Sequence, residues 1–298
     1  MAIYRDYDRA ALDAQYNNRL RVPDFATYFA RWKAGSDSAR DRLLAEGARL
    51  DVAYGSSPLE RLDIFPAKAS EGLKPPVLAF IHGGYWRALD KADFTFTAPP
   101  YVDAGITYVT INYGLVPMVS VDEILRQSRA ALAWLYRNPQ AHGGDIHRLY
   151  VSGHSAGGQL APLMMTHDWK AQGLPRDLVK GAVAISGLFD LEPIRLSYLD
   201  EGMNLDAAAV RRLSPINLVP PASKRQAPLV LCVGGAESPE FLRQQEAYAE
   251  AWARSQAPAT VVEAPGANHF SVMDVMADPA SALFRAVREL VQGSGARP

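Results

Sequence analysis

The sequence predicts an α/β protein: a mostly parallel, eight-stranded sheet with helices on both faces and a helical segment at its N-terminus. Eight short runs of apolar and β-branched residues follow residue 48, each with the length and composition of a strand. From residue 76 onward these runs alternate with segments that suit helices, which is typical of a parallel sheet covered on both sides. The chain has 298 residues, 48% of them apolar and 21% charged, so we expect one folded domain over residues 1–298.

The first 48 residues contain no clear strand and are expected to form two or three helices. Phe25, Tyr28, Phe29 and Trp32 recur at the spacing that places side chains on one face of a helix. This aromatic stripe has two readings, either ordinary packing against the rest of the domain or a lid over an active site. The sequence leaves both readings open for residues 1–48.

The strand runs differ in their expected direction. The first two are separated by the turn-rich segment GSSP, so we expect an antiparallel hairpin at one edge of the sheet. The other six are expected to run parallel to one another. The eight runs cover residues 49–55, 59–65, 76–82, 107–113, 148–153, 182–186, 228–235 and 259–263.

Four helices are expected between or after these strands. Ser120 is followed at the third position by Glu123, a capping-box spacing, and the helix it opens should stop at Asn138 before Pro139. The other three should follow Ser155, begin at Pro239 after Ser238, and cover residues 280–292. Residues 191–227 are rich in proline and are expected to form a helix-and-loop insertion rather than a second domain.

Charge and cysteine content exclude several classes of protein. Lys and Arg number 31 against 32 Asp and Glu, without a basic stripe, so no nucleic-acid partner is expected. The charged first ten residues do not suit a secretion signal, and no window approaches the roughly 18 apolar residues of a membrane span. We therefore expect a soluble, cytoplasmic protein without a membrane partner. Cys232, the only cysteine, lies in an apolar run and is expected to be a buried structural thiol.

The segment GHSAG at residues 153–157 predicts a nucleophilic serine. It follows a predicted strand and precedes a predicted helix, which is the context that the G-x-S-x-G turn requires. Small residues flank Ser155 because this turn is too tight for larger side chains. Ser155 also stands at the start of a helix, whose free N–H groups favour a developing anion.

Backbone amides for that anion are expected from two places. Ala156, directly after the serine, would supply one N–H, and a glycine-rich loop after an earlier strand usually supplies another. Gly83 and Gly84 follow the third predicted strand directly, within the segment HGGYW. These three residues form the predicted oxyanion hole, although a plain turn with His82 packed beneath it is the alternative for the loop.

Only one of the six histidines suits the role of base. In proteins with this elbow the order is serine, acid, histidine, which leaves His167 and His269. His167 is 12 residues along the helix after Ser155, or about 18 Å away at 1.5 Å per residue. His269 lies just past the last strand, so it is the predicted base. His154 adjoins the serine on a tight turn, where its side chain should point elsewhere.

An acid that orients the base is expected at the end of another strand. Glu237 follows the seventh predicted strand and precedes the predicted N-cap Ser238, which places it on a loop beside His269. Glu240 would lie in the first helical turn and needs no catalytic explanation. Glu237 is the first candidate, and Asp190, at the end of the segment AVAISGLFD that begins with the sixth run, is its rival.

Together these motifs give a resemblance to a known family. HGGYW, GHSAGG, ESPEF and NHF resemble the kynurenine formamidase (arylformamidase) group of α/β-hydrolases and the bacterial esterases related to it. The segments LDAQYNNRLRVPDF and SGLFDLEPI extend the resemblance over nearly the whole chain from about residue 10. The HGG and G-x-S-x-G pair, and the segment YGLVP at residues 113–117, are also similar to the wider hormone-sensitive-lipase-like esterases.

The resemblance implies an α/β-hydrolase fold with Ser155 as nucleophile, His269 as base and Glu237 as acid. The better-known formamidases commonly have aspartate in place of this glutamate, which loosens the inference that N-formylkynurenine is the substrate. We expect a small ester or aryl formamide to be cleaved through an acyl-enzyme, without a metal or organic cofactor. Tyr85 and Trp86 would form an apolar wall beside an aromatic ring, or else pack internally.

Two other functions stay open. One is a general carboxylesterase of the hormone-sensitive-lipase type without formamidase activity, because the sequence does not give the volume of the acyl pocket. The other is a catalytically silent binding protein on the same fold. Such proteins usually lack one member of the triad. A homodimer is compatible with the sequence, which does not determine the oligomeric state.

Overall fold

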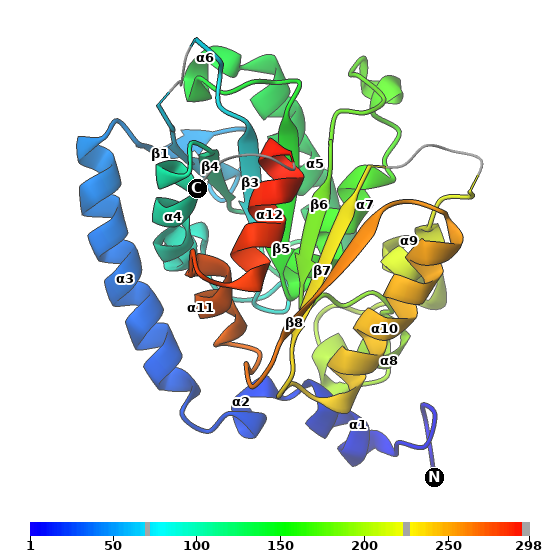
Figure 1. Ribbon diagram of the computed structural model, residues 1–298. Coiled ribbons are helices and arrows are strands. Elements are labelled where there is room, and N and C mark those ends of the chain that lie inside the picture. The colour runs from blue at the N-terminus through cyan, green and yellow to red at the C-terminus, as the bar shows by residue number, and fades with distance from the viewer. Residues whose placement is uncertain (69–71, 223–226, 294–298) are drawn as a thin grey trace.

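The computed structural model describes residues 1–68, 72–222 and 227–293 (Figure 1). All eight predicted strands are present in one sheet, in the order β1-β2-β4-β3-β5-β6-β7-β8. The strands are β1 (Arg49–Ala53), β2 (Arg61–Phe65), β3 (Val77–Ile81), β4 (Thr107–Ile111), β5 (Leu149–His154), β6 (Ala182–Ile185), β7 (Leu229–Gly234) and β8 (Ala259–Ala264). As predicted, β1 and β2 pair antiparallel at one edge, and β3 to β8 are parallel.

The helices alternate with the strands and include several that the sequence did not predict. The α-helices are α1 (Arg9–Tyr16), α2 (Asn18–Arg21), α3 (Phe25–Ala45), α4 (Ala98–Asp103), α5 (Val121–Arg137), α6 (Pro139–His142), α7 (Ala156–Met165), α8 (Glu192–Arg195), α9 (Ala207–Leu213), α10 (Pro239–Arg254), α11 (Val272–Ala277) and α12 (Ala282–Gln292). Short 3-10 helices are η1 (Lys91–Thr97), η2 (Trp169–Gln172), η3 (Tyr198–Asp200) and η4 (Pro215–Leu218). The expected helices after residues 120, 155, 238 and 280 correspond to α5, α7, α10 and α12.

The helix caps agree with the sequence in part. The Ser120 hydroxyl accepts a hydrogen bond from the amide of Glu123, as a capping box requires. The Glu123 carboxylate does not return this bond to Ser120, because it binds Arg126 and Gln127 instead. Ser238 caps α10, with Pro239 at its first position.

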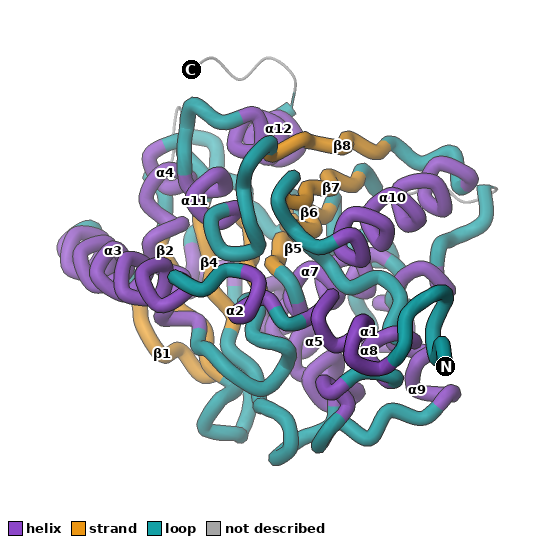
Figure 2. The backbone as a smooth tube through the Cα atoms, turned by 90° about the horizontal axis from the view of Figure 1, so that it is seen from below, coloured by secondary structure: helices purple, strands orange, loops and turns teal. Residues whose placement is uncertain are grey.

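The sheet has a hydrophobic core on each face. In β3, Val77, Ala79 and Ile81 face one core, and Leu78 and Phe80 face the other. Helices α1, α5, α7 and α10 cover the first core, whereas α3, α4, α11 and α12 cover the second. The same division appears in the view along the sheet (Figure 2). The central strands β3, β4, β6 and β7 are therefore buried on both faces, as their apolar sequences require, whereas the edge strands β1 and β8 are partly exposed.

The carboxyl ends of the parallel strands lie at one rim of the sheet. Ile81 of β3 pairs with Gly153 of β5, and Ile185 of β6 pairs with both His154 and Cys232. The loops that follow these strands therefore emerge side by side. Helix α2 lies on this side of the molecule, at the bottom of Figure 1 and in front in Figure 2.

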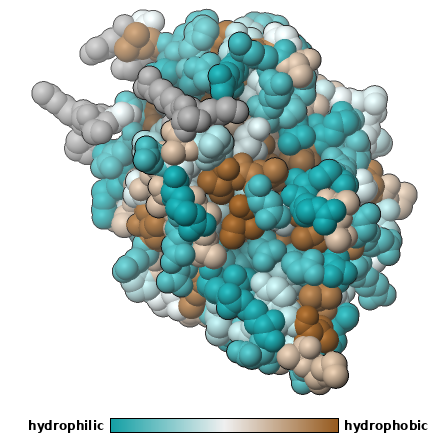
Figure 3. Space-filling view, turned by 90° about the vertical axis from the view of Figure 1, so that its right-hand side faces the viewer, coloured by the Kyte–Doolittle hydropathy of each residue, from teal (hydrophilic) through white to brown (hydrophobic). Residues whose placement is uncertain are grey.

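The predicted insertion at residues 191–227 contains the short helices α8, η3, α9 and η4, and its residues 223–226 lie outside the described residues. The face with α9 and α10 is mainly hydrophilic, with hydrophobic residues in small patches (Figure 3). Cys232 is buried in β7, and burial raises the pKa of its thiol to about 12. Among the described residues, no helix has the length and apolar character needed to cross a bilayer.

Candidate active site

Ser155 lies on a sharp turn between β5 and α7. Its φ angle is +55°, in the left-handed region, and its amide donates to the carbonyl of Ile185 at 2.8 Å. A Cβ atom on Gly153 would lie 2.2 Å from the carbonyl oxygen of Gly157, and one on Gly157 would lie 1.9 Å from that of Ile81. Glycine is therefore required at both positions for α7 to start against β3 and β5.

The structure brings the three predicted triad residues into one hydrogen-bonded chain. His269 Nδ1 donates to Glu237 Oε2 at 2.6 Å. Its other nitrogen, Nε2, then accepts from the Ser155 hydroxyl at 3.0 Å. His269 is 6% exposed and Glu237 is 5% exposed, so little water competes for these bonds. The arrangement can take a proton from the hydroxyl and stabilise the charged imidazole that results.

Two further groups hold the Glu237 carboxylate. Its Oε1 accepts from the hydroxyl of Ser186 at 2.5 Å and from the amide of Gly234 at 2.9 Å. Ser186 directly follows β6 and was not singled out from the sequence. The available signal was a hydroxyl residue that ends the apolar run AVAI at the same rim as the elbow.

The other acidic candidates do not contact His269. The Asp190 carboxylate accepts from the hydroxyl of Tyr4 and the amide of Glu192. Glu240 binds Tyr16 and Arg243, so it belongs to a structural network on α10. The geometry thus places Glu237, rather than Asp190, beside the histidine.

The predicted oxyanion loop lies against the serine. A Cβ atom on Gly83 would come within 3.0 Å of Ser155 Cβ and of the His154 carbonyl oxygen. Gly84 has a φ angle of +110°, and a Cβ there would lie 2.1 Å from the Ala88 carbonyl oxygen. Within the described part of the chain, neither glycine amide has a hydrogen-bond acceptor. These donors are therefore free for a substrate oxygen, beside Ala156 at the start of α7.

His154 has a place in the site that the sequence did not indicate. Its Nε2 donates to the backbone carbonyl of His269 at 2.9 Å, and the two rings lie 4.7 Å apart between centroids. Burial and the neighbouring His269 hold the pKa of His154 well below its usual value. The neutral ring thus fixes the loop that carries the base.

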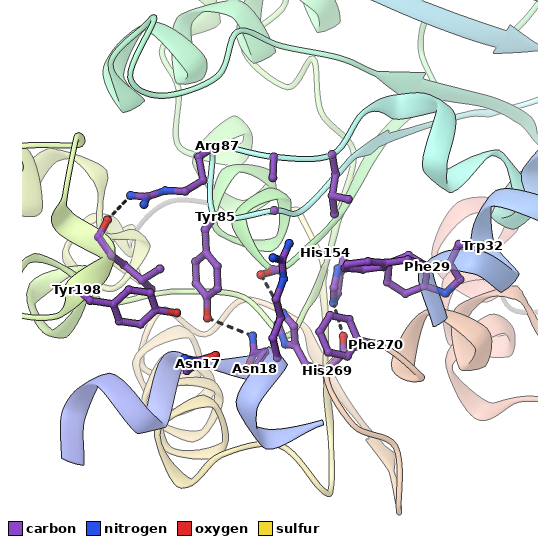
Figure 4. A pocket seen from close by; sticks show the side chains of 16 residues that line it. Asn17, Asn18, Phe29, Trp32, Tyr85, Arg87, His154, Tyr198, His269 and Phe270 are labelled. Carbon is purple, nitrogen blue, oxygen red and sulfur yellow. Dashed lines mark hydrogen bonds between the residues drawn. The ribbon is translucent and has the colours of Figure 1, made fainter. Parts of the chain in front are cut away.

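A cavity of about 460 Å³ opens onto Ser155 and His269 (Figure 4). Phe29, Trp32, Leu89 and Phe270 form an apolar side. Other groups form a more polar side, made of Asn17, Asn18, Arg19, Tyr85, Arg87 and Tyr198. Residues from α2 and α3 thus form part of the wall, and whether residues 1–48 move as a lid stays a prediction.

The two aromatic residues after the glycines have different positions. Tyr85 lines the cavity, and its hydroxyl donates to the Tyr16 carbonyl at 2.7 Å and accepts from Asn18 at 3.1 Å. Trp86 is fully buried, does not line the cavity, and donates to Gln159 at 3.1 Å. The prediction that Trp86 contacts the substrate is therefore wrong, because its ring turns into the core above α7.

Comparison with known proteins shows the family to which this chain belongs. A family model described as BD-FAE matches residues 62–239. A kynurenine formamidase from Salmo salar is 30% identical over 287 residues, which cover 93% of this chain and 95% of the relative. A kynurenine formamidase from Danio rerio is 28% identical over 287 residues, which cover 93% of this chain and 94% of the relative. A provisionally assigned thioesterase from Silicibacter sp. TM1040 has a crystal structure with a TM-score of 0.78 at 30% identity, covering 94% of this chain and 98% of that chain. The chain belongs to the BD-FAE family of α/β-hydrolases.

Proposed function

We propose that this chain is a serine hydrolase that cleaves an aryl formamide or a small carboxylic ester through an acyl-enzyme. One observation carries the proposal: hydrogen bonds connect Glu237 to His269 and His269 to Ser155, and Ser155 lies beside the free backbone amides of Gly83 and Gly84. Such a constellation is the one that acyl transfer requires. The similarity to kynurenine formamidases over most of the chain supports the same reaction class.

The mechanism follows from these contacts. His269 Nε2 takes the proton as Ser155 Oγ attacks the carbonyl carbon, and Glu237 stabilises the imidazolium. Amides of Gly83, Gly84 and Ala156 hold the negative oxygen, each worth about 2.7–4 kcal/mol of barrier. His269 then protonates the departing amine or alcohol. Water then attacks the acyl-enzyme by the same steps, with His269 again as base. The chemistry therefore needs no metal or organic cofactor.

The cavity favours a substrate with an aromatic ring and a negative charge. Phe29, Trp32 and Phe270 offer ring faces and edges to an apolar group. Arg19, whose guanidinium lies 5.2 Å from the ring of Phe25, and Arg87 also line the cavity. Among the described lining residues there is no Asp or Glu. An aryl formamide with a carboxylate, such as N-formylkynurenine, suits this environment better than a neutral alkyl ester.

Substrate comparison tests the proposal. We expect turnover of N-formylkynurenine to exceed that of p-nitrophenyl butyrate in kcat/KM, because a formyl group needs little acyl space. Equal or better efficiency on butyrate, with none on the formamide, would instead support the general carboxylesterase. Ser155→Ala should lower kcat by on the order of 10⁶, and Glu237→Ala by on the order of 10⁴, as in subtilisin.

A silent binding protein is the remaining alternative. Labelling by a fluorophosphonate probe separates it from a hydrolase, since only an activated serine reacts. Absence of an adduct on Ser155 in the folded protein would support the silent alternative. A cytoplasmic location, and a small molecule as the partner rather than nucleic acid or a membrane, remain predictions from composition.

A further inference from the structure

The loop that carries the oxyanion glycines has an unusual backbone. Gly84, Tyr85 and Trp86 have φ angles of +110°, +50° and +59°, so three successive residues are left-handed, and Leu89 follows at +71°. Side chains with a Cβ disfavour this region, so the conformation persists only where the surroundings enforce it. The loop must therefore be held by contacts outside its own backbone.

Trp86 supplies one such contact. Its ring is fully buried, and its Nε1 donates to Gln159 Oε1 at 3.1 Å. The Gln159 side chain is itself fixed, because its Nε2 donates to the Leu213 carbonyl at 2.7 Å. Gln159 lies one turn along α7 from the nucleophile, and its backbone N–H donates to the backbone carbonyl of Ser155 at 3.0 Å.

Tyr85 supplies a second contact in another direction. Its hydroxyl joins the loop to the carbonyl of Tyr16 and the amide group of Asn18 (Figure 4). Tyr16 is fixed in turn by hydrogen bonds from its own hydroxyl to Glu240 and from Gln244. This contact secures the outer side of the loop, whereas the bond of Trp86 secures the side next to α7.

We propose that Trp86 and Gln159 are positioning residues for the oxyanion hole. Their hydrogen bond joins the two segments that provide its donors: the loop with Gly83 and Gly84, and the first turn of α7 with Ala156. The proposal rests on the proposed function, because it assigns these amides to a reacting oxygen. It gives Trp86 a role through the glycines rather than through substrate contact.

Geometry explains why this bond affects the transition state more than substrate binding. Oxyanion donors must lie about 2.7–3.1 Å from the oxygen of the tetrahedral intermediate, and a misplacement of about 1 Å can cost 10²-fold in rate. The cavity also has walls outside this loop, formed by Phe29, Trp32 and Phe270, which remain in place for substrate binding when the glycines shift. A looser loop should thus lower kcat and leave KM nearly unchanged.

Trp86→Phe tests the proposal, with Trp169→Phe as its matched control. Trp169 is also buried, and its Nε1 donates to the Met164 carbonyl at 2.9 Å, away from the loop. Both substitutions remove one indole and one buried hydrogen bond, so both should lower the Tm. On p-nitrophenyl acetate we expect Trp86→Phe to lower kcat at least about tenfold with KM within about twofold, and Trp169→Phe to change kcat less than about twofold.

A double-mutant cycle provides the second test. Gln159→Met removes the acceptor and keeps the length of the side chain, so Trp86→Phe and Gln159→Met should affect kcat much less than multiplicatively when combined. Fully multiplicative effects would overturn the proposal, as would equal kcat losses in Trp86→Phe and Trp169→Phe. Turnover by the unmodified protein tests the proposed function separately. Failure of the positioning role is therefore distinguishable from failure of the proposed hydrolase function.

Discussion

At the scale of single residues, the length of the acidic side chain is explained by its surroundings. The resemblance to formamidases indicated that aspartate is common where this chain has Glu237. Here the carboxylate extends far enough for Oε1 to bind Ser186 and Gly234 while Oε2 binds His269. The extra methylene thus fits an acid whose two oxygens have separate tasks.

Ser186→Ala should weaken the orientation of this acid. It removes a hydrogen bond to a charged group, worth about 1.5–3 kcal/mol, and leaves Gly234 as the remaining donor to Glu237 Oε1. We expect kcat to fall on the order of tenfold, which is about 1.4 kcal/mol, with KM little changed. Steady-state kinetics at saturating substrate would measure this.

Ser128→Ala is the control for that variant. Ser128 is also fully buried, and its hydroxyl donates to the Ile124 carbonyl within α5, outside the site. A kcat loss of the same size in Ser128→Ala would contradict the assigned role, since it would then reflect general loosening of the fold. An unchanged kcat in Ser186→Ala would contradict it as well.

Sequence order and spacing predicted the position of the triad because each member follows a strand. Ser155, Glu237 and His269 come after β5, β7 and β8, whose ends meet at one rim. Ser186 and His154 were missed because their contributions depend on side-chain directions, which periodicity does not specify. The direction of Trp86 was wrong for the same reason: residues next to a glycine turn do not follow strand alternation.

At the scale of secondary structure, long elements were predicted and short ones were not. Helices α5 and α10 have enough turns to show an apolar face, and their caps mark where they begin. Helix α11 has six residues, Val272–Ala277, and η1 has seven, Lys91–Thr97. So few residues do not show a periodicity that distinguishes such a helix from a loop, so these elements become visible only through their packing.

Helix α1 offers a test of the lid hypothesis. Leu12 is fully buried against the first core, although it belongs to the segment that the sequence allowed as a lid. If α1 is a fixed part of the core, Leu12→Ala should lower the free energy of unfolding by about 2–5 kcal/mol, as large cavities do. Urea denaturation followed by circular dichroism would measure the change.

Leu20→Ala in α2 is the matched control within the same segment. Leu20 is 71% exposed, so its truncation should change stability by no more than about 0.5 kcal/mol. A similarly small effect for Leu12→Ala would show that α1 docks loosely and would favour a lid that includes it. A large effect would limit any such motion to the segment around α2.

At the scale of the whole molecule, the sequence predicted the composition of the sheet but not the complete strand order. The placement of β4 between β2 and β3 depends on contacts between segments far apart in the chain. Local patterns do not encode which neighbour a strand selects, beyond the antiparallel hairpin of β1 and β2. The alternating strands and helices nevertheless limited the architecture to a parallel sheet with two covered faces.

Buried histidines predict how stability depends on pH. Burial lowers the pKa values of four of them below the usual value: His82, His142, His154 and His167, the last to about 4. In the unfolded chain these groups bind a proton near pH 6.5. Between pH 7 and 5 the unfolded state therefore binds more protons than the folded state, so the free energy of unfolding should fall as pH falls. Urea denaturation at pH 7, 6 and 5 would measure it.

His142→Gln isolates one contribution to this slope. His142 lies in α6, away from the site, where its Nε2 donates to the Leu135 carbonyl and its Nδ1 accepts from the Gly144 amide. Glutamine does not titrate, so the variant should lose stability less steeply between pH 6.5 and 5, by up to about 1.4 kcal/mol per pH unit. Carboxylates with lowered pKa values, such as Asp51 and Glu123, titrate below this window. A slope equal to that of the unmodified protein would mean that His142 takes up its proton without unfolding, and that the acid sensitivity arises elsewhere.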